Sequence, residues 1–270
     1  MNSDIFDKEE KFHDDWAKSE NIDDIDIIKS NEALTAPEMR YITKQILSCN
    51  KKTLLDVGSG LGEASIYFAM KGFKVTALDI SKEMLLFTER LAAKYNVDVN
   101  TIHSTAESLN IDKGQKFDII YVGNLFHHVN IAETLSKLCR HLNDDGILVS
   151  WDPIAYNPAI NIYRNLATDV RTEDEHPLTL NDFKIFKKHF SIVNKKYFWF
   201  TTLIIFFVMY FVQRRNPNEE RYWKKVVDEG HKWSWLYRPL EIFDKFLLFL
   251  IPPLRLLCWN VVLVCKNNSL

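Results

Sequence analysis

The 270-residue sequence lacks several features that would assign it to particular classes of protein. Its formal net charge is only −2, so no strong overall field is available to recruit nucleic acid. Its four cysteines show no metal-ligand spacing, and neither do its histidines and acids, so no metal cofactor is expected. The first ten residues are acidic and have no apolar core, so no secretory signal is expected. We therefore expect a cytoplasmic protein with reduced thiols.

Apolar residues make up 47% of the sequence and charged residues 26%, a composition that can build the core of one large domain. Charge is divided unevenly along the chain. Residues 181–270 hold 15 Lys and Arg against 7 Asp and Glu, whereas the first 180 residues hold 19 against 29. The basic part is also rich in aromatic residues. This pairing favours anionic membrane surfaces or amphipathic ligands, and a solvated basic face is the alternative.

Short apolar segments alternate with helical patterns from residue 53 onward. Such alternation predicts an α/β fold in which helices cover both faces of a parallel sheet, with ligands at the carboxyl ends of the strands. Asp118, early in the fourth strand, is expected to cap neighbouring N–H groups. The predicted strands are 53–57, 73–78, 97–102, 117–122 and 146–151.

A glycine-rich turn follows the first strand in the stretch LLDVGSGLGEASIYFA. Gly58 and Gly60 allow positive φ and a close approach of the backbone to a ligand. The helix that begins near Leu61 points its N–H groups to the same place. The spacing is Gly-x-Gly-x-Gly, whereas the dinucleotide fingerprint is Gly-x-Gly-x-x-Gly. A nucleotide-binding turn of another kind stays an alternative, and an NAD-dependent enzyme is disfavoured.

Three further stretches follow this turn in order: VTALDIS, which places Asp79 at the end of the second strand, then FDIIYVGNLFHHV and LNDDGILVSWDP. Together the four stretches resemble the class I S-adenosylmethionine-dependent methyltransferases, especially the small-molecule group often labelled type 11. The resemblance covers about residues 36–200. It implies a doubly wound, seven-stranded Rossmann-like sheet, S-adenosyl-L-methionine as cofactor and S-adenosyl-L-homocysteine as product.

The resemblance also implies a set of cofactor contacts. The glycines would line the methionine part, while Asp79 would bind the ribose and Ile80 would pack on the adenine. Asn124 would lie beside the methionine amino group, which Asp56 would support. Many family members place an acid on the adenine amino group, where the stretch STAES here has Thr105. The implied cofactor-binding residues are Asp56, Gly58, Ser59, Gly60, Gly62, Asp79, Ile80, Thr105, Ala106, Glu107, Asn124 and Leu125.

Two adjacent histidines are the predicted catalytic residues. Methyl transfer from a sulfonium is an in-line displacement that depends mainly on alignment, and a base is needed only where the attacking atom carries a proton. His127 and His128 follow Asn124 in the loop that should face the donor methyl group. An imidazole can accept a proton from a hydroxyl group or a phenol near neutral pH. The resemblance favours His128, and the alternative is that both histidines only shape the pocket.

Two segments are expected to contact the methyl acceptor. The connection after the fifth strand is long and polar, although its Arg171 could equally form surface ion pairs. Residues 1–35 are expected to form a helical lid in which Phe12, His13 and Trp16 cover the cofactor, with plain packing on the domain as the alternative. The predicted acceptor contacts are Phe12, Trp16, Phe126, Asp152, Tyr156, Tyr163, Arg171 and His176.

The apolar run YFWFTTLIIFFVMYFV, residues 197–212, divides into two parts. Its first four residues complete a sixth strand, and a seventh is expected in LCWNVVLVCKN, residues 257–267. The other twelve residues would rise about 18 Å as a helix, while a bilayer core needs about 30 Å, so no membrane span is expected. Residues 201–255 then form an insertion before the last strand. Residues 36–200 and 256–270 form the cofactor-binding core.

The insertion combines apolar helical blocks with aromatic and basic residues, as in RYWKKVVDEGHKWSWLYR. This composition suits a water–lipid boundary, a cap whose aromatic residues are buried, or a homo-oligomer interface. We expect an apolar cap over the acceptor site, and peripheral contact with a membrane is a further hypothesis.

The predicted function is methyl transfer to a hydrophobic small molecule, such as a lipid, an isoprenoid, a quinone-like compound or an aromatic natural product. Two alternatives stay open. One is a soluble methyltransferase for a polar metabolite or sugar, with the cap as an oligomer interface. The other is a cofactor-binding assembly factor without activity.

Overall fold

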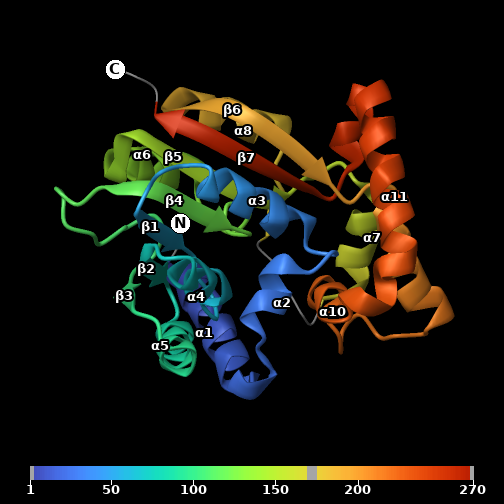
Figure 1. Ribbon diagram of the computed structural model, residues 1–270, viewed down its shortest axis with the longest axis horizontal. Coiled ribbons are helices and arrows are strands. Elements are labelled where there is room, and N and C mark those ends of the chain that lie inside the picture. Colours follow the sequence, from blue (N-terminus) through green and yellow to red (C-terminus); the bar gives the residue numbers. More distant parts are fainter. Residues whose placement is uncertain (1–2, 169–174, 268–270) are drawn as a thin grey trace.

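The computed structural model describes residues 3–168 and 175–267. Seven strands form one sheet in the order β3-β2-β1-β4-β5-β7-β6 (Figure 1). Neighbouring strands are parallel except at β7, which runs antiparallel to both β5 and β6. The strands are β1 (Thr53–Val57), β2 (Lys74–Asp79), β3 (Val99–His103), β4 (Phe117–Gly123), β5 (Leu142–Pro153), β6 (Phe190–Phe198) and β7 (Asn260–Asn267).

Helices cover both faces of this sheet. One apolar cluster joins α3, α4 and α5 to one face, through residues such as Ile42 and Phe68. A second cluster joins α6 and α8 to the other face, through residues such as Leu135 and Phe186. The predicted doubly wound α/β fold is therefore confirmed. The helices outside the insertion are α1 (Ser3–Ser19), α2 (Ile27–Glu32), α3 (Pro37–Leu47), α4 (Glu63–Met70), α5 (Lys82–Tyr95), α6 (Ile131–His141), α7 (Pro158–Leu166) and α8 (Leu180–His189).

The inner strand β1 illustrates why both faces are covered. Leu54 belongs to the first cluster, whereas Leu55 and Val57 belong to the second, as the two-residue period of a strand requires. All three are fully buried. The predicted strands lie within a few residues of the observed ones, although β5 begins at Leu142 rather than Gly146.

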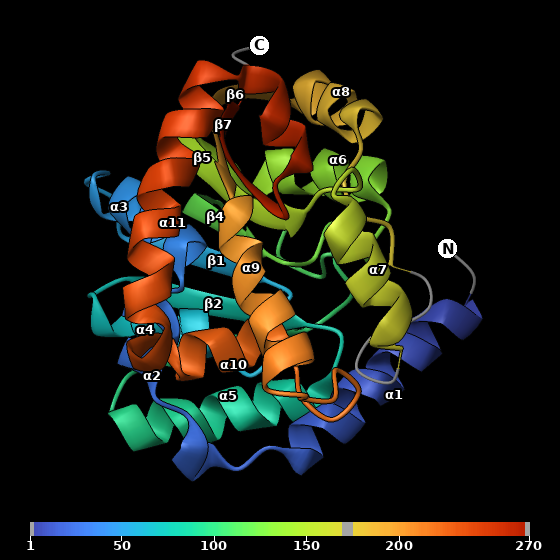
Figure 2. The same ribbon diagram turned by 90° about the vertical axis from the view of Figure 1, so that its right-hand side faces the viewer.

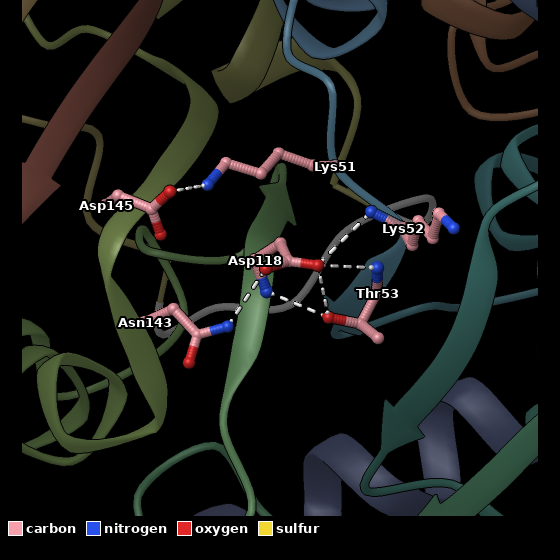
Figure 3. A network of polar contacts seen from close by, with 6 residues as sticks. All are labelled: Lys51, Lys52, Thr53, Asp118, Asn143 and Asp145. Atoms are coloured by element: carbon pink, nitrogen blue, oxygen red, sulfur yellow. Dashed lines mark hydrogen bonds and ion pairs between the residues drawn. The ribbon is translucent and has the colours of Figure 1, made fainter.

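The amino ends of β1, β4 and β5 are joined by one carboxylate, that of Asp118 (Figure 3). Its Oδ2 accepts hydrogen bonds from the backbone nitrogens of Lys52 (3.1 Å) and Thr53 (3.0 Å), and its Oδ1 accepts one from the Asn143 amide (2.9 Å). Burial alone would raise the pKa of Asp118, but the hydrogen bonds outweigh it and lower the pKa to about 2. The capping role predicted for Asp118 is confirmed.

A helical insertion separates β6 from β7, as predicted. The run of residues 197–212 finishes β6 at Phe198, two residues earlier than expected, and turns at Trp199, which has a φ of +63°. The next residues form three short helical pieces. In order, the insertion contains η2 (Thr201–Leu203), α9 (Ile204–Phe207), η3 (Val208–Val212), α10 (Tyr222–Asp228), α11 (Gly230–Leu250) and η4 (Pro252–Leu257).

Asp244 of α11 holds the start of the insertion. Its carboxylate accepts hydrogen bonds from the backbone nitrogens and hydroxyls of Thr201 and Thr202, at distances between 2.6 and 3.3 Å. These bonds satisfy N–H groups that a helix start leaves unpaired. Figure 2 shows α9 and α11 on the same side of the molecule. Within residues 3–168 and 175–267, no helix is both long enough and apolar enough to cross a membrane.

Candidate active site

A cavity of about 380 Å³ lies at the carboxyl ends of β1, β2 and β4, where an open parallel sheet is expected to bind ligands. The turns after these strands form one wall. Side chains of α1, α3 and the insertion form the others. Eleven of the twelve residues predicted to bind the cofactor line this single cavity; Gly62 does not.

The glycine-rich turn brings backbone N–H groups to the end of β2. Gly58 and Gly60 have φ values of +72° and +53°, which residues with a side chain rarely adopt. The backbone nitrogen of Gly60 donates to Oδ2 of Asp79 at 2.8 Å, and Oδ1 of Asp79 accepts from the backbone nitrogen of Ser81 at 2.9 Å. Asp79 is therefore held at the cavity wall by the turn itself.

Asp56 lies beneath the turn and is buried. It accepts a hydrogen bond of 2.6 Å from the Ser65 hydroxyl. Burial, together with the charge of Asp79, raises the pKa of Asp56 to about 7, and the Ser65 hydrogen bond only partly offsets this. A cationic ligand in the cavity would favour the charged form of Asp56.

Gly62 has a role different from the one the resemblance implies. It begins α4 with a φ of +81°, and a Cβ at this position would lie 2.5 Å from Oγ1 of Thr88 on α5. Real Cβ contacts are not that short, so glycine is needed where the two helices meet. We correct the expectation that Gly62 lines the cofactor.

The stretch 104–107 forms the wall next to Ile80. The Thr105 hydroxyl donates to the Ser108 hydroxyl (2.9 Å) and accepts from the Ser108 backbone nitrogen (3.0 Å), so it stabilises a local turn. Glu107 is buried, which raises its pKa, and it accepts a hydrogen bond of 3.0 Å from the backbone nitrogen of Asn130. Glu107 thus fastens the end of the histidine loop, residues 124–130.

The histidine loop follows β4 and faces the cavity. Asn124 begins it with a φ of +57°. His127 is buried, and its Nδ1 lies 3.0 Å from Oδ1 of Asp152. His128 is half-buried, with its Nδ1 3.5 Å from Oε1 of Glu9 on the N-terminal helix. Both histidines line the cavity, so the loop presents two imidazoles beside the proposed cofactor wall.

The predicted acceptor contacts are only partly brought together. Phe12 and Trp16 line the cavity. Phe126 instead packs in the core against Phe186, with ring centroids 4.9 Å apart. Asp152 is fully buried behind His127. Arg171 lies outside the described residues.

The remaining three predicted acceptor contacts lie away from the cavity lining. The Tyr156 hydroxyl accepts from the backbone nitrogen of Leu180. Tyr163 packs against Phe206 of the insertion. His176 is exposed, and its backbone nitrogen donates to the His127 carbonyl at 2.7 Å. These positions support neighbouring elements.

The N-terminal helix and the insertion meet over the cavity. The indole of Trp16 lies 4.2 Å from the guanidinium of Arg221 and 6.3 Å from the ring of Trp223. Lys224 forms an ion pair of 2.9 Å with Glu20. The N-terminal helix and the insertion are therefore joined by cation–π and ionic contacts, and their roles as lid and cap stay predictions.

His127, His128 and Glu175 form a group that the sequence did not predict. Their ligand-capable atoms all lie within 4.8 Å of one another. Two imidazoles and a carboxylate are ligands that suit a transition metal better than magnesium. These three residues are the ones in the described part of the chain that could hold a metal, and the expectation of no metal cofactor stays a prediction.

The inner end of the cavity was missed at the sequence level. It is lined by Glu38 of α3, Asn260 of β7 and four aromatic side chains, Tyr121, Trp151, Trp199 and Trp259. These residues come from six separate elements or junctions, and only the sheet order brings them together. A local motif could not have revealed them.

Comparisons with known proteins agree with this geometry. A family described as a methyltransferase domain matches residues 54–146, which span the glycine-rich turn, Asp79 and the histidine loop. Over these residues the chain matches a methyltransferase domain, as the four sequence stretches indicated. The fold that they indicated is confirmed, and the cofactor of this domain class is S-adenosyl-L-methionine.

Curated relatives of the methyltransferase domain include two proteins named ubiquinone biosynthesis O-methyltransferase. The protein from Rickettsia prowazekii is 31% identical over 116 residues, which are 41% of this chain and 45% of the relative. The one from Serratia proteamaculans is 30% identical over 119 residues, which are 44% of this chain and 49% of the relative. The chain thus spans less than half the length of these curated relatives.

Solved structures with the same fold cover much more of the chain. Geranyl diphosphate C-methyltransferase from Streptomyces coelicolor covers 86% of this chain and 81% of its own, with a TM-score of 0.55 at 14% identity. An S-adenosylmethionine-dependent methyltransferase from Clostridium acetobutylicum covers 91% and 93%, with a TM-score of 0.53 at 13% identity. At such identities the likeness establishes the fold alone.

The residues of the cavity fit S-adenosylmethionine. A Cβ at Gly60 would meet no atom within 4 Å, so the backbone there borders open space. The Ser59 hydroxyl is buried and has no hydrogen-bond partner among the described residues. Asp79 stands at the end of β2, where an acid can accept from ribose hydroxyls. Gly60, Ser59 and Asp79 would hold the cofactor, with Asp56 near its cationic part.

Proposed function

We propose that this protein transfers a methyl group from S-adenosylmethionine to an oxygen atom of a hydrophobic, ring-containing small molecule. The observation that carries the proposal is the continuity of one cavity. Its lining includes Gly60 and Asp79, the two histidines His127 and His128, and a group of aromatic side chains. A donor and an acceptor could therefore meet at the histidine loop.

The chain's own residues have separable tasks in this reaction. When bound, S-adenosylmethionine supplies a methyl group on a cationic sulfur, which an acceptor atom displaces in line. Asp79 and the glycine-rich turn fix the donor. His128 lines the cavity and can accept a hydroxyl proton. Asp152 orients His127 from behind, and α1 with α10 excludes water from above.

The proposed acceptor class rests on the cavity lining and on the relatives. Four aromatic rings at the inner end favour a flat, apolar body over a sugar. The curated relatives are named as O-methyltransferases of ubiquinone biosynthesis. A quinone-like aromatic acceptor combines both features.

The insertion would supply such an acceptor from an anionic bilayer surface. Helix α11 buries one side, through Trp233, Tyr237 and Leu248. The other side carries an exposed apolar stripe at helical spacing: Trp235, Ile242, Phe246 and Phe249 are 61–79% exposed. Phe211 and Val212 of η3 add apolar surface that is 67% and 73% exposed. A helix with apolar side chains on a second, exposed side needs a second apolar environment.

Charge complementarity favours a bilayer over a second protein copy as that environment. Phe249 borders a hollow that Lys195, Lys196, Lys245 and Arg255 also line. Glu241 and Asp244 line the same hollow, but the carboxylate of Asp244 is occupied by its hydrogen bonds at the start of the insertion. Aromatic side chains beside cations are typical of the interface between lipid and water, where anionic headgroups add attraction.

Cofactor binding tests the proposed function most directly. We expect S-adenosylhomocysteine to raise the melting temperature of the purified protein and NAD to leave it unchanged. Asp79→Asn should weaken S-adenosylhomocysteine binding about tenfold in a calorimetric titration, because it loses charged hydrogen bonds to the ribose. Asp118→Asn, at the other edge of the sheet, is the matched control. If neither the cofactor nor its product binds, the proposal is wrong.

Methylation itself is then tested on a panel of hydrophobic ring compounds. The wild-type protein and S-adenosylmethionine are incubated with phenols, catechols and reduced quinones, and mass spectrometry follows a gain of about 14 Da per methyl group. Sugars and amino acids form the comparison panel. Methylation confined to that second panel would contradict the hydrophobic acceptor.

A further inference from the structure

An acid–amide pair closes the inner end of the cavity. The Asn260 side-chain nitrogen donates to Oε1 of Glu38 at 2.7 Å. Glu38 belongs to the first turn of α3, and Asn260 is the first residue of β7. Asn260 pairs with Pro153 at the end of β5 and with Phe198 at the end of β6. The pair therefore stands at the carboxyl edge of the sheet, on the same cavity as Gly60 and Asp79.

One acceptor atom of this pair receives no hydrogen bond from the described residues. Oδ1 of Asn260 is buried and has no hydrogen-bond partner among the described residues, and the side chain is only 3% exposed. A buried acceptor without a donor destabilises a fold by about 1–3 kcal/mol, so such atoms are rare in native proteins. Because Asn260 lines the cavity, a ligand hydroxyl group could supply the missing donor.

The neighbouring carboxyl group is also available to a hydroxyl. Glu38 is 6% exposed, and its burial raises its pKa despite the hydrogen bond from Asn260. Glu38 and Asn260 both line the cavity, and Oδ1 of Asn260 can accept a hydrogen bond from a ligand hydroxyl group beside the Glu38 carboxyl group. The pair thus offers polar atoms to a hydroxyl group at an otherwise aromatic end of the cavity.

The backbone at this end of the cavity is strained. Trp199 has a φ of +63°, a conformation that costs a bulky residue on the order of 1–3 kcal/mol. Its indole is buried next to Trp259, with ring centroids 6.1 Å apart, and its hydrogen bond to Glu38 acts on that carboxyl. Strain of this kind persists where the surrounding structure enforces it, and binding sites are common places for it.

From these observations we infer that Glu38 and Asn260 bind a hydroxyl group of the methyl acceptor, whose flat apolar ring packs on Tyr121, Trp151, Trp199 and Trp259. The inference rests on the proposed function and narrows its acceptor to a ring compound with a hydroxyl group at its inner end. This hydroxyl is an anchor, distinct from the atom that the histidine loop faces. Glu38 and Asn260 are then residues that determine specificity.

A pair of probes of similar shape tests the subsite. We would titrate 2-naphthol and naphthalene into the protein with S-adenosylhomocysteine present, and follow each probe by ligand-detected NMR. The wild type should bind 2-naphthol about tenfold tighter than naphthalene, the fold-change of one well-made buried hydrogen bond. Asn260→Leu should remove this preference and leave the affinity for naphthalene within about twofold.

Two further variants keep the test decisive. Glu38→Gln preserves the shape, but its new amide can donate to Oδ1 of Asn260 and occupy it, so the preference should again fall. If Asn260→Leu fails to fold, Glu38→Gln tests the subsite in its place. The control is Asn143→Leu, which breaks the matched pair in which Asn143 donates to Asp118 at the opposite edge of the sheet (Figure 3). It should keep the full preference for 2-naphthol.

Three results would overturn the inference. The wild type could bind both probes equally, Asn260→Leu and Glu38→Gln could both keep the preference, or Asn143→Leu could lose it as they do. The pair would then serve only to link α3 to β7. The failure of the proposed function would look different: S-adenosylhomocysteine would not bind, while the preference for 2-naphthol could still be measured without it.

Discussion

Oδ1 of Asp152 lies 3.0 Å from Nδ1 of His127 and 3.3 Å from the backbone nitrogen of the same residue. One carboxyl oxygen thus fixes both the ring and the backbone of the histidine loop. Burial raises the pKa of Asp152 well above its usual range, although backbone hydrogen bonds from His127, Phe126 and Leu125 oppose this. Asp152 belongs to β5, so the rigid sheet positions a loop that faces the cavity.

We predict that Asp152→Asn slows methyl transfer about 10- to 100-fold, because the loop would lose its alignment with the acceptor. The affinity for S-adenosylhomocysteine should change less than threefold, since Asp152 does not line the cavity. Both quantities are measured on the same preparation, by initial rates and by calorimetry. A variant with normal rates would show that the loop does not depend on this contact.

Single substitutions distinguish the roles of His127 and His128. His128→Ala should reduce the rate more than His127→Ala, because the His127 ring is buried and paired with Asp152, while the His128 ring is more exposed and lies next to the N-terminal helix. Rates are compared between pH 6 and 9 with a phenolic acceptor. If both variants keep full activity, neither imidazole accepts the proton.

Gly62 gives a prediction about stability. Gly62→Ala should lower the free energy of unfolding by about 2–3 kcal/mol, since the new methyl group would strike Thr88 and the residue would keep a φ of +81°. Thr88→Ala in the same chain should recover part of this loss by removing the two closest atoms. Gly60→Ala is the matched control: its methyl group meets open space, so about 1 kcal/mol is expected. Urea unfolding at one pH measures all four proteins.

Much of the cofactor wall could be predicted because its residues are local. Gly58, Gly60 and Asp79 belong to one strand–turn–helix–strand unit. The glycine spacing and the acid at the end of a strand can both be read directly from the sequence. Gly62 shows the limit of this reasoning, because its partner Thr88 belongs to the next helix. The sequence shows a third glycine at this spacing, but it does not show the contact with the next helix that requires a glycine there.

The acceptor end could not be predicted from local patterns. Glu38 and Asn260 are 222 positions apart in the chain, and they meet only because β7 inserts between β5 and β6. Asp152 and Tyr163 were expected to contact the acceptor since they lie in a polar connection, but burial turned one toward His127 and the other toward Phe206. The polar composition of this connection indicated which edge of the sheet holds the site. It did not indicate which of its side chains face the cavity.

Asp56 gives a pH-dependent prediction. Its pKa is raised to about 7, so the folded protein binds the proton of Asp56 more tightly than the unfolded chain does. The wild type should therefore lose stability relative to Asp56→Asn as the pH rises from about 4 to about 7, by at most about 1.4 kcal/mol per pH unit. Above pH 7 the difference should stay constant. Urea unfolding at intervals between pH 4.5 and 8.5 would reveal this.

Asp118→Asn is the control for this pH series. The pKa of Asp118 is lowered to about 2, so its contribution is fully present above its unfolded pKa and is lost only as the pH falls through the range from about 4 to about 2. Between pH 4.5 and 8.5 the difference between Asp118→Asn and the wild type should not vary. Parallel slopes for wild type and Asp56→Asn would contradict a perturbed Asp56.

The apolar stripe of α11 gives the last prediction. Wild-type protein should float with vesicles of phosphatidylglycerol and phosphatidylcholine, and binding should weaken at high salt because the cations around Phe249 are then screened. Phe246→Ser with Phe249→Ser should lower the partition coefficient about tenfold or more, since each ring removes about 1 kcal/mol or more of apolar burial. Leu47→Ser with Leu86→Ser is the control, because these residues are 48% and 42% exposed on α3 and α5.

The two pairs of substitutions remove apolar surface from different places. In Figure 1, α5 lies at the lower left of the molecule and α11 at the right. A loss of flotation confined to the α11 pair therefore assigns lipid contact to the stripe and not to general hydrophobicity. Light scattering tests the alternative that the stripe is a dimer interface. If the wild type were a dimer that the α11 substitutions dissociate, and if it stayed in the vesicle-free fraction, the stripe would cover a second copy of the chain instead of lipid.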